Sequence, residues 1–121
     1  MERLSFGADA AFVPRGSLLE GVTAAPLTPP LASGVPVQAA IFRVAPKGRI
    51  GRHPATVPQI LAVLEGSGET SGGDGVFQPI TAWEAVFWAK GEEHETKTEE
   101  GLTALVLEGD GIQMFRRLGN S

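Results

Sequence analysis

Short apolar runs separated by glycine- and proline-rich turns characterise the sequence from Val37 onward. The runs contain β-branched and aromatic residues, which favour strands, and turn residues lie between them. They recur roughly every eight to twelve residues, a spacing typical of an all-β barrel or sandwich. The expected strands are Gln38–Val44, Gln59–Leu64, Val76–Ile80, Glu84–Trp88, His94–Thr98 and Leu102–Leu107. No heptad repeat and no long helical pattern competes with this interpretation.

Glycines and prolines predict where these strands end. The segment Glu65–Gly68 predicts a turn that breaks the chain after the strand at residues 59–64. The cluster Gly72–Gly75 predicts a hairpin. Prolines interrupt Arg49–Pro58, so we expect a loop or an irregular strand there. The segment Ile112–Leu118 closes the chain.

The first 36 residues differ in composition from the rest. Four prolines between Gly21 and Pro36 rule out a helix or a central strand in that segment. We therefore expect residues 1–36 to form an arm and an extended connection that pack on a barrel or on a partner subunit. Residues 37–118 are expected to form the barrel, and a chain of 121 residues is expected to be a single domain overall.

Composition and charge exclude several classes of function. The net charge of -4 and the isoelectric point near 5.1 argue against binding to nucleic acid or to an anionic membrane. The absence of cysteine excludes disulfides and thiolate chemistry. No apolar run reaches the ~20 residues needed to cross a bilayer, and no signal peptide is visible at the start. We expect a cytoplasmic protein.

The candidate chemistry comes from two histidines and one glutamine. His53 lies just before a predicted strand, and His94 lies at the start of a later one. Gln59 begins a face that it shares with Leu61 and Val63. An unpaired buried amide costs ~1–3 kcal/mol, so Gln59 needs a partner, for which the candidates are either histidine, water or a metal.

Aromatic side chains supply the second set of candidates. Phe42, Phe77, Phe87 and Trp88 are expected in the core rather than on a stacking surface. Because side chains alternate along a strand, either Phe87 or Trp88 should face an interior cavity.

Two stretches resemble the motifs of the cupin superfamily, G(x)5HxH(x)3–4E(x)6G and G(x)5PxG(x)2H(x)3N. His53 occupies the first histidine place, Gln59 the glutamate place and Gly66 the closing glycine. Gly91 and His94 match the centre of the second motif. The resemblance covers about residues 37–108. It implies a double-stranded β-helix, or jelly-roll barrel, that encloses a ligand cavity and often forms a homodimer.

The sequence departs from these motifs at the positions that would bind a metal. Ala55 replaces the second histidine, and Gln59 replaces the glutamate. A site of His53, Gln59 and His94 would carry no protein charge to offset a divalent metal. Zinc, iron, nickel or manganese would therefore bind weakly or not at all.

The resemblance leaves three functions open: a barrel that binds a small organic ligand, a metal-dependent oxygenase or isomerase, and a degenerate barrel that acts only in protein association. We favour the first, and the sequence does not decide whether the protein is an enzyme. The ligand would be contacted by His53, Gln59, His94, Phe42, Leu61, Phe87 and Trp88.

Overall fold

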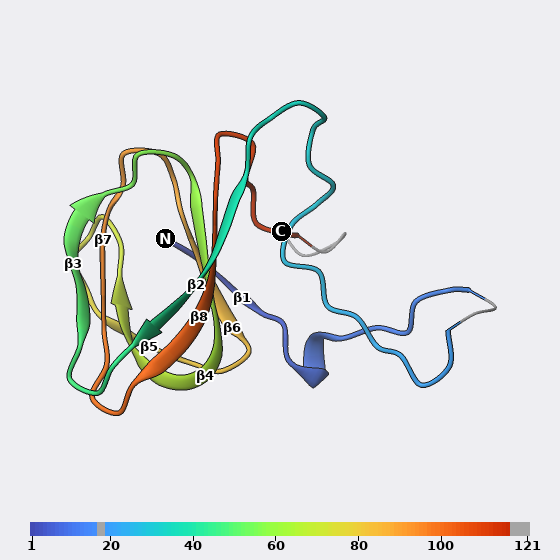
Figure 1. Ribbon diagram of the computed structural model, residues 1–121, viewed down its shortest axis with the longest axis horizontal. Helices are drawn as coiled ribbons and strands as arrows, with labels where there is room; N and C mark the ends of the chain where they lie inside the picture. Colours follow the sequence, from blue (N-terminus) through green and yellow to red (C-terminus); the bar gives the residue numbers. More distant parts are fainter. Residues whose placement is uncertain (17–18, 117–121) are drawn as a thin grey trace.

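We describe the fold from a computed structural model of the chain, in which residues 1–16 and 19–116 are described. It consists of strands and irregular segments, with one short 3-10 helix (Figure 1). The elements are β1 (Glu2–Ser5), η1 (Ala8–Ala10), β2 (Gln38–Val44), β3 (Arg49–Pro54), β4 (Gln59–Ser71), β5 (Gln78–Thr81), β6 (Glu84–Trp88), β7 (Glu93–Lys97) and β8 (Leu102–Glu108). The expectation of an all-β fold is confirmed.

The strands form two antiparallel sheets that share β4. The large sheet has the order β1-β6-β4-β8-β2, and the small sheet has the order β3-β7-β4-β5. In Figure 1, β3 and β7 lie on one side of the barrel, and β2, β8 and β6 lie on the other. The N-terminal half of β4 belongs to the large sheet and its C-terminal half belongs to the small sheet. This arrangement closes the barrel around an interior.

The predicted turn at Glu65–Gly68 is wrong, because β4 continues through it to Ser71. The ladder with β8 shifts register between Val63 and Glu65, and Gly66 adopts a φ of 82°. These glycines mark a bend and a close backbone approach within one strand. A Cβ on Gly66 would lie 2.2 Å from the carbonyl oxygen of Gly101, and one on Gly68 would lie 2.3 Å from that of Lys97.

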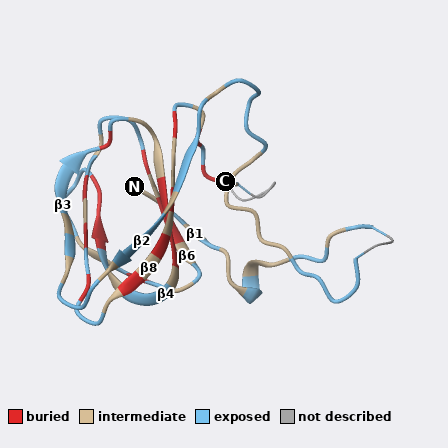
Figure 2. Ribbon diagram, viewed as in Figure 1, coloured by how far each residue is buried: buried red, intermediate tan, exposed pale blue. Residues whose placement is uncertain are grey.

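Apolar side chains pack on both faces of the large sheet, and buried residues lie along its central strands (Figure 2). The inner core lies inside the barrel and consists of Leu61, Val63, Ile80, Val86, Trp88, Leu102, Ala104 and Val106. The outer core lies on the opposite face and consists of Ile60, Ala62, Ala85, Ile112 and Met114, with Leu4, Phe6, Leu27, Phe87, Leu105 and Leu107 packed against it. Successive side chains along β4, β6 and β8 thus point alternately into the inner and the outer core.

Three residues of the N-terminal segment, Leu4, Phe6 and Leu27, pack against this outer core. The strand β1 pairs with β6, and Leu27 packs against the outer core. The described residues between them, 6–16 and 19–26, extend away from the barrel, and a bridge pairs Phe12 with Ala24 (Figure 1). Residues 117 and 118, the last two of the expected barrel segment, lie outside the described residues.

Within residues 1–16 and 19–116, no helix has the length and apolar character needed to cross a membrane.

Candidate functional site

A cavity of about 180 Å³ lies inside the barrel, between the two sheets. Phe42 and His53 are exposed, and they mark the mouth. Buried residues, including Leu61 and Trp88, form the interior end. The full lining is Phe42, Ile50, His53, Gln59, Leu61, Trp88, His94, Thr96, Val106 and Glu108.

The large sheet contributes a row of three cavity residues through its strand register. Gln59 on β4 lies directly opposite Trp88 on β6 and opposite Glu108 on β8. Residues paired in this way point to the same face of a sheet. The side-chain amide of Gln59 donates a hydrogen bond of 3.0 Å to Oε2 of Glu108. The amide that the sequence left without a partner is therefore paired with a carboxylate.

The small sheet contributes both histidines through a register pair of its own. His53 on β3 lies opposite His94 on β7, and the centroids of their rings are 4.3 Å apart at an interplanar angle of 56°. The ring of Trp88 stacks on His94 at 4.3 Å and 24°. The three rings thus join the two sheets across one side of the cavity.

Backbone carbonyls fix the tautomer of both imidazoles. Nδ1 of His53 lies 2.7 Å from the oxygen of Gly51, and Nδ1 of His94 lies 3.1 Å from the oxygen of Glu92. A carbonyl oxygen only accepts, so each Nδ1 carries the proton and donates it. In the neutral ring, the lone pair is then on Nε2. Each histidine keeps an unshared acceptor for a ligand or a metal.

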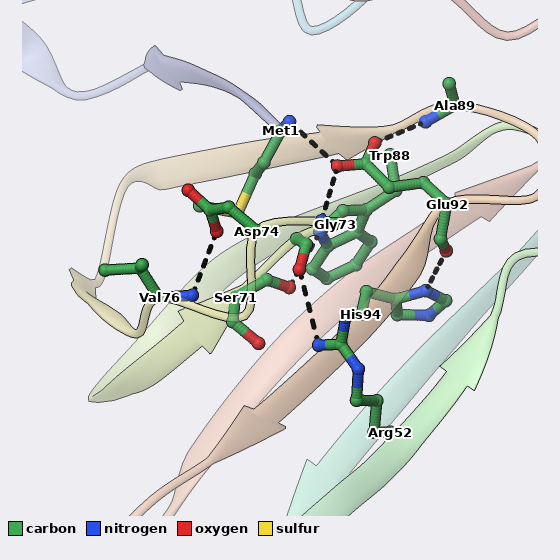
Figure 3. Close-up of polar contacts among 11 residues, drawn as sticks. Met1, Arg52, Ser71, Gly73, Asp74, Val76, Trp88, Ala89, Glu92 and His94 are labelled. Carbon is green, nitrogen blue, oxygen red and sulfur yellow. Dashed lines mark hydrogen bonds and ion pairs between the residues drawn. The ribbon is translucent and has the colours of Figure 1, made fainter.

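Glu92 holds the turn that positions His94 (Figure 3). Its carboxylate accepts hydrogen bonds from the ammonium group of Met1 at 2.9 Å, the amide of Gly73 at 3.0 Å and the amide of Ala89 at 3.1 Å. Burial alone would raise the pKa of Glu92, but these hydrogen bonds and the nearby ammonium charge hold the pKa below its usual value. The side chain of Glu92 fixes the turn, and its carbonyl orients the imidazole.

Burial keeps His94 neutral. Its side chain is only 3% exposed, and this loss of solvation lowers the pKa of the imidazole below 6.5. The adjacent His53 lowers this pKa further, whereas the hydrogen bond to Glu92 opposes the shift. The interior of the cavity therefore presents an uncharged imidazole at neutral pH.

Comparisons with known proteins agree with this architecture. No protein-family model matches the sequence, and no curated protein matches it. Among solved structures, an RmlC-like cupin from Shewanella frigidimarina superposes with a TM-score of 0.58 at 18% identity over 61% of this chain and 66% of its own. The chain has the cupin fold.

Two further structural neighbours carry the names of enzymes. A predicted oxalate decarboxylase from Thermotoga maritima is 25% identical, with a TM-score of 0.53 over 57% of this chain and 62% of its own. The polyketide cyclase RemF from Streptomyces resistomycificus is 26% identical, with a TM-score of 0.56 over 70% of this chain and 62% of its own. In all three cases the match spans less than two-thirds of the other protein.

The cupin barrel brings together six of the seven residues expected from the sequence. His53, Gln59, His94, Phe42, Leu61 and Trp88 line the cavity. Phe87 does not, because it packs against the outer core on the opposite face of the large sheet. Alternation along β6 thus places Trp88 inside the barrel and Phe87 outside it.

Sequence reasoning missed four residues that line this cavity: Ile50, Thr96, Val106 and Glu108. Thr96 is two residues from His94 on the same strand, so alternation could have found it. The expected strand at 102–107 ended one residue before Glu108, whose position depends on its register with Gln59. The cavity therefore contains a carboxylate that the motif comparison did not predict.

The residues present do not complete the metal site that the cupin motifs imply. Among residues 1–16 and 19–116, no group of three or more His, Cys, Asp or Glu side chains is placed to hold a metal ion. The two imidazoles are adjacent, but Ala55 supplies no ligand and the amide of Gln59 is hydrogen-bonded to Glu108. We therefore derive no chemistry through a bound metal.

Proposed function

We propose that this cupin binds a small organic molecule in the barrel cavity. The observation that carries the proposal is the convergence of polar groups from two sheets on one apolar interior. His53 and His94 arrive from the small sheet, and Gln59 and Glu108 arrive from the large sheet. A concave, largely apolar pocket with a few convergent polar groups is the usual form of a small-molecule site.

Apolar, aromatic and polar residues of the lining would make different contacts with a ligand. Ile50, Leu61 and Val106 supply apolar walls whose contact with a ligand removes apolar surface from water. The stacked rings of Trp88 and His94 are rigidly held and add aromatic surface. The polar groups would fix the orientation of the ligand.

One observation favours metal-dependent catalysis as a second candidate. Both histidines donate Nδ1–H to a backbone carbonyl and keep Nε2 unshared, which is the arrangement that orients imidazole ligands in metal sites. Metal analysis of untagged protein tests this candidate. Stoichiometric zinc, iron, nickel or manganese that is lost in His94→Ala would support it, and absence of bound metal after incubation with each ion would reject it.

A single-tryptophan variant tests binding in the cavity. The chain has two tryptophans, so Trp83→Phe leaves Trp88 as the only indole, and Trp83 lies outside the cavity lining. We expect toluene to produce a saturable change in Trp88 emission. Leu61→Phe, which fills the cavity, should weaken toluene binding by about tenfold or more, because its added ring occupies the space that a guest needs.

The matched control changes the other face of the same sheet. Phe87→Leu alters a residue that packs against the outer core, so it should leave toluene binding unchanged. Both variants need a cooperative thermal transition before comparison. No saturable response of Trp88, or an equal loss in both variants, would contradict the proposed function.

A further inference from the structure

The polar hydrogens of the cavity lining are almost all used within the protein. The Nδ1–H groups of His53 and His94 are donated to backbone carbonyls. The indole Nε1–H of Trp88 is donated to the carbonyl of Ser71 at 3.2 Å. These three rings therefore offer no further donor to a neutral ligand.

The hydroxyl and amide groups follow the same pattern. Thr70 donates its hydroxyl to the carbonyl of Glu95, so its hydrogen bond of 2.9 Å with Thr96 uses the proton of Thr96. One N–H of Gln59 is donated to Glu108. The remaining N–H of Gln59 is the one side-chain donor left among the lining residues.

Acceptors, in contrast, remain available. The Nε2 lone pairs of His53 and His94, Oε1 of Gln59 and Oε1 of Glu108 have no hydrogen-bonding partner within the described part of the chain. The lining includes no lysine, arginine or tyrosine, and its one ionisable acid is Glu108. An anionic ligand would meet a carboxylate and several lone pairs with no cation to offset its charge.

The space available limits the size of the ligand. A dry cavity of about 150 Å³ accommodates benzene. The cavity here, about 180 Å³, admits one ring with small substituents. The stacked pair Trp88 and His94 supplies a flat aromatic surface beside that space.

Building on the proposed function of the cavity, we propose that its ligand is an uncharged single-ring molecule bearing hydrogen-bond donors, such as ring hydroxyl or amide N–H groups, and that carboxylates are excluded. Donors on the ring would pair with the lone pairs of His53, His94 and the Gln59–Glu108 pair. Selectivity would come from the mismatch between a carboxylate ligand and a lining that already presents Glu108.

An isosteric series tests the donor requirement. Resorcinol, m-cresol and m-xylene have similar shapes and carry two, one and no hydroxyl groups. Titration calorimetry and Trp88 emission in Trp83→Phe should give affinities that fall in this order, with about a tenfold loss from resorcinol to m-xylene. Hydrophobic transfer alone predicts the reverse order. Observation of the reverse order would overturn the proposal.

Benzamide and benzoate test the role of charge at nearly constant shape. Benzamide should bind about tenfold or more tightly than benzoate, and Glu108→Gln should reduce this difference by raising the affinity for benzoate. The control Glu69→Gln removes an exposed carboxylate outside the cavity and should leave both affinities unchanged. Equal affinities in the unmodified protein, or no effect of Glu108→Gln, would reject the inference.

These experiments separate the two levels of the proposal. If m-xylene or benzoate binds as well as its partners, the cavity is a binding site but its selectivity is not the one inferred here. If none of the five probes perturbs Trp88 or releases heat, both the inference and the proposed function fail.

Discussion

Two backbone carbonyls, those of Gly51 and Glu92, determine the tautomer and orientation of the two cavity histidines. Each holds an Nδ1–H and thereby directs the lone pair to Nε2. His94 is buried in an interior that solvates charge poorly, so protonation of its ring is unfavourable in the folded state. Because His53 lies beside it, protonation of both rings would also place two positive charges close together.

Stability should therefore depend on pH through His94. Its pKa is lowered in the folded state, so the unfolded chain binds more protons between 6.5 and the lower folded value. The free energy of unfolding should be at its full value above pH 6.5 and should fall as the pH drops through this window. Urea denaturation at a series of pH values would measure the slope.

His94→Asn provides the comparison, since it removes the titrating ring. The slope of stability against pH below 6.5 should become shallower in this variant. Titration of Glu92 does not overlap with this slope. The pKa of Glu92 is lowered from its usual value of 4.5, so its contribution to stability is lost only below pH 4.5. An NMR titration of the His94 ring in the unmodified protein gives a second measurement. A midpoint at or above 6.5 would contradict the expected shift.

At the scale of elements, β4 connects the two sheets, and its C-terminal bound was wrongly predicted from sequence. Its glycines carry the same local signal as a turn. What distinguishes a turn from a bent strand here is the approach of Gly101 and Lys97, which are more than 25 residues further along the chain. Local sequence contains no information about these neighbours. Strands with ordinary turns, such as Glu84–Trp88, were predicted at their observed bounds.

Gly66→Ala should destabilise the protein strongly. The residue has a φ of 82°, and a Cβ would lie 2.2 Å from the carbonyl oxygen of Gly101, so both strain and a backbone clash result. We expect a loss of roughly 2–4 kcal/mol in the free energy of unfolding, or failure to fold. Chemical denaturation provides the measurement.

Gly51→Ala is the matched control for that substitution. Gly51 lies in β3, its φ is not positive, and among the described residues other than its chain neighbours no atom lies within 4 Å of a Cβ built there. Its stability should change by less than about 1 kcal/mol. Equal effects at the two glycines would refute the close-approach explanation of Gly66.

At the scale of the whole molecule, the sequence contained the histidine pair and the all-β architecture, but not the complete lining of the cavity. Motif spacing identified His53 and His94 as candidate cavity residues, but His53 was expected in a loop or an irregular strand, whereas it lies in β3 opposite His94. Glu108 was not predicted as a cavity residue, because its position depends on the register between β8 and β4, which pairs residues 49 positions apart. The choice between Phe87 and Trp88 likewise required knowledge of which face of the large sheet is covered by the N-terminal segment and the residues after β8.

The two cores should unfold as one unit because they occupy opposite faces of the same strands. Leu61 in the inner core and Ile60 in the outer core are neighbours on β4, so neither face can separate while the other stays intact. Ile112→Ala removes a buried outer-core side chain and should cost roughly 2–5 kcal/mol. In the Trp83→Phe background, the unfolding midpoint reported by Trp88 should fall by the same amount as the midpoint from far-UV circular dichroism.

The control is Val76→Ala, which changes an exposed position outside both cores and should leave the two midpoints unchanged. A Trp88 midpoint unaffected by Ile112→Ala would show that the outer core melts independently and that the shared sheet does not couple the two faces.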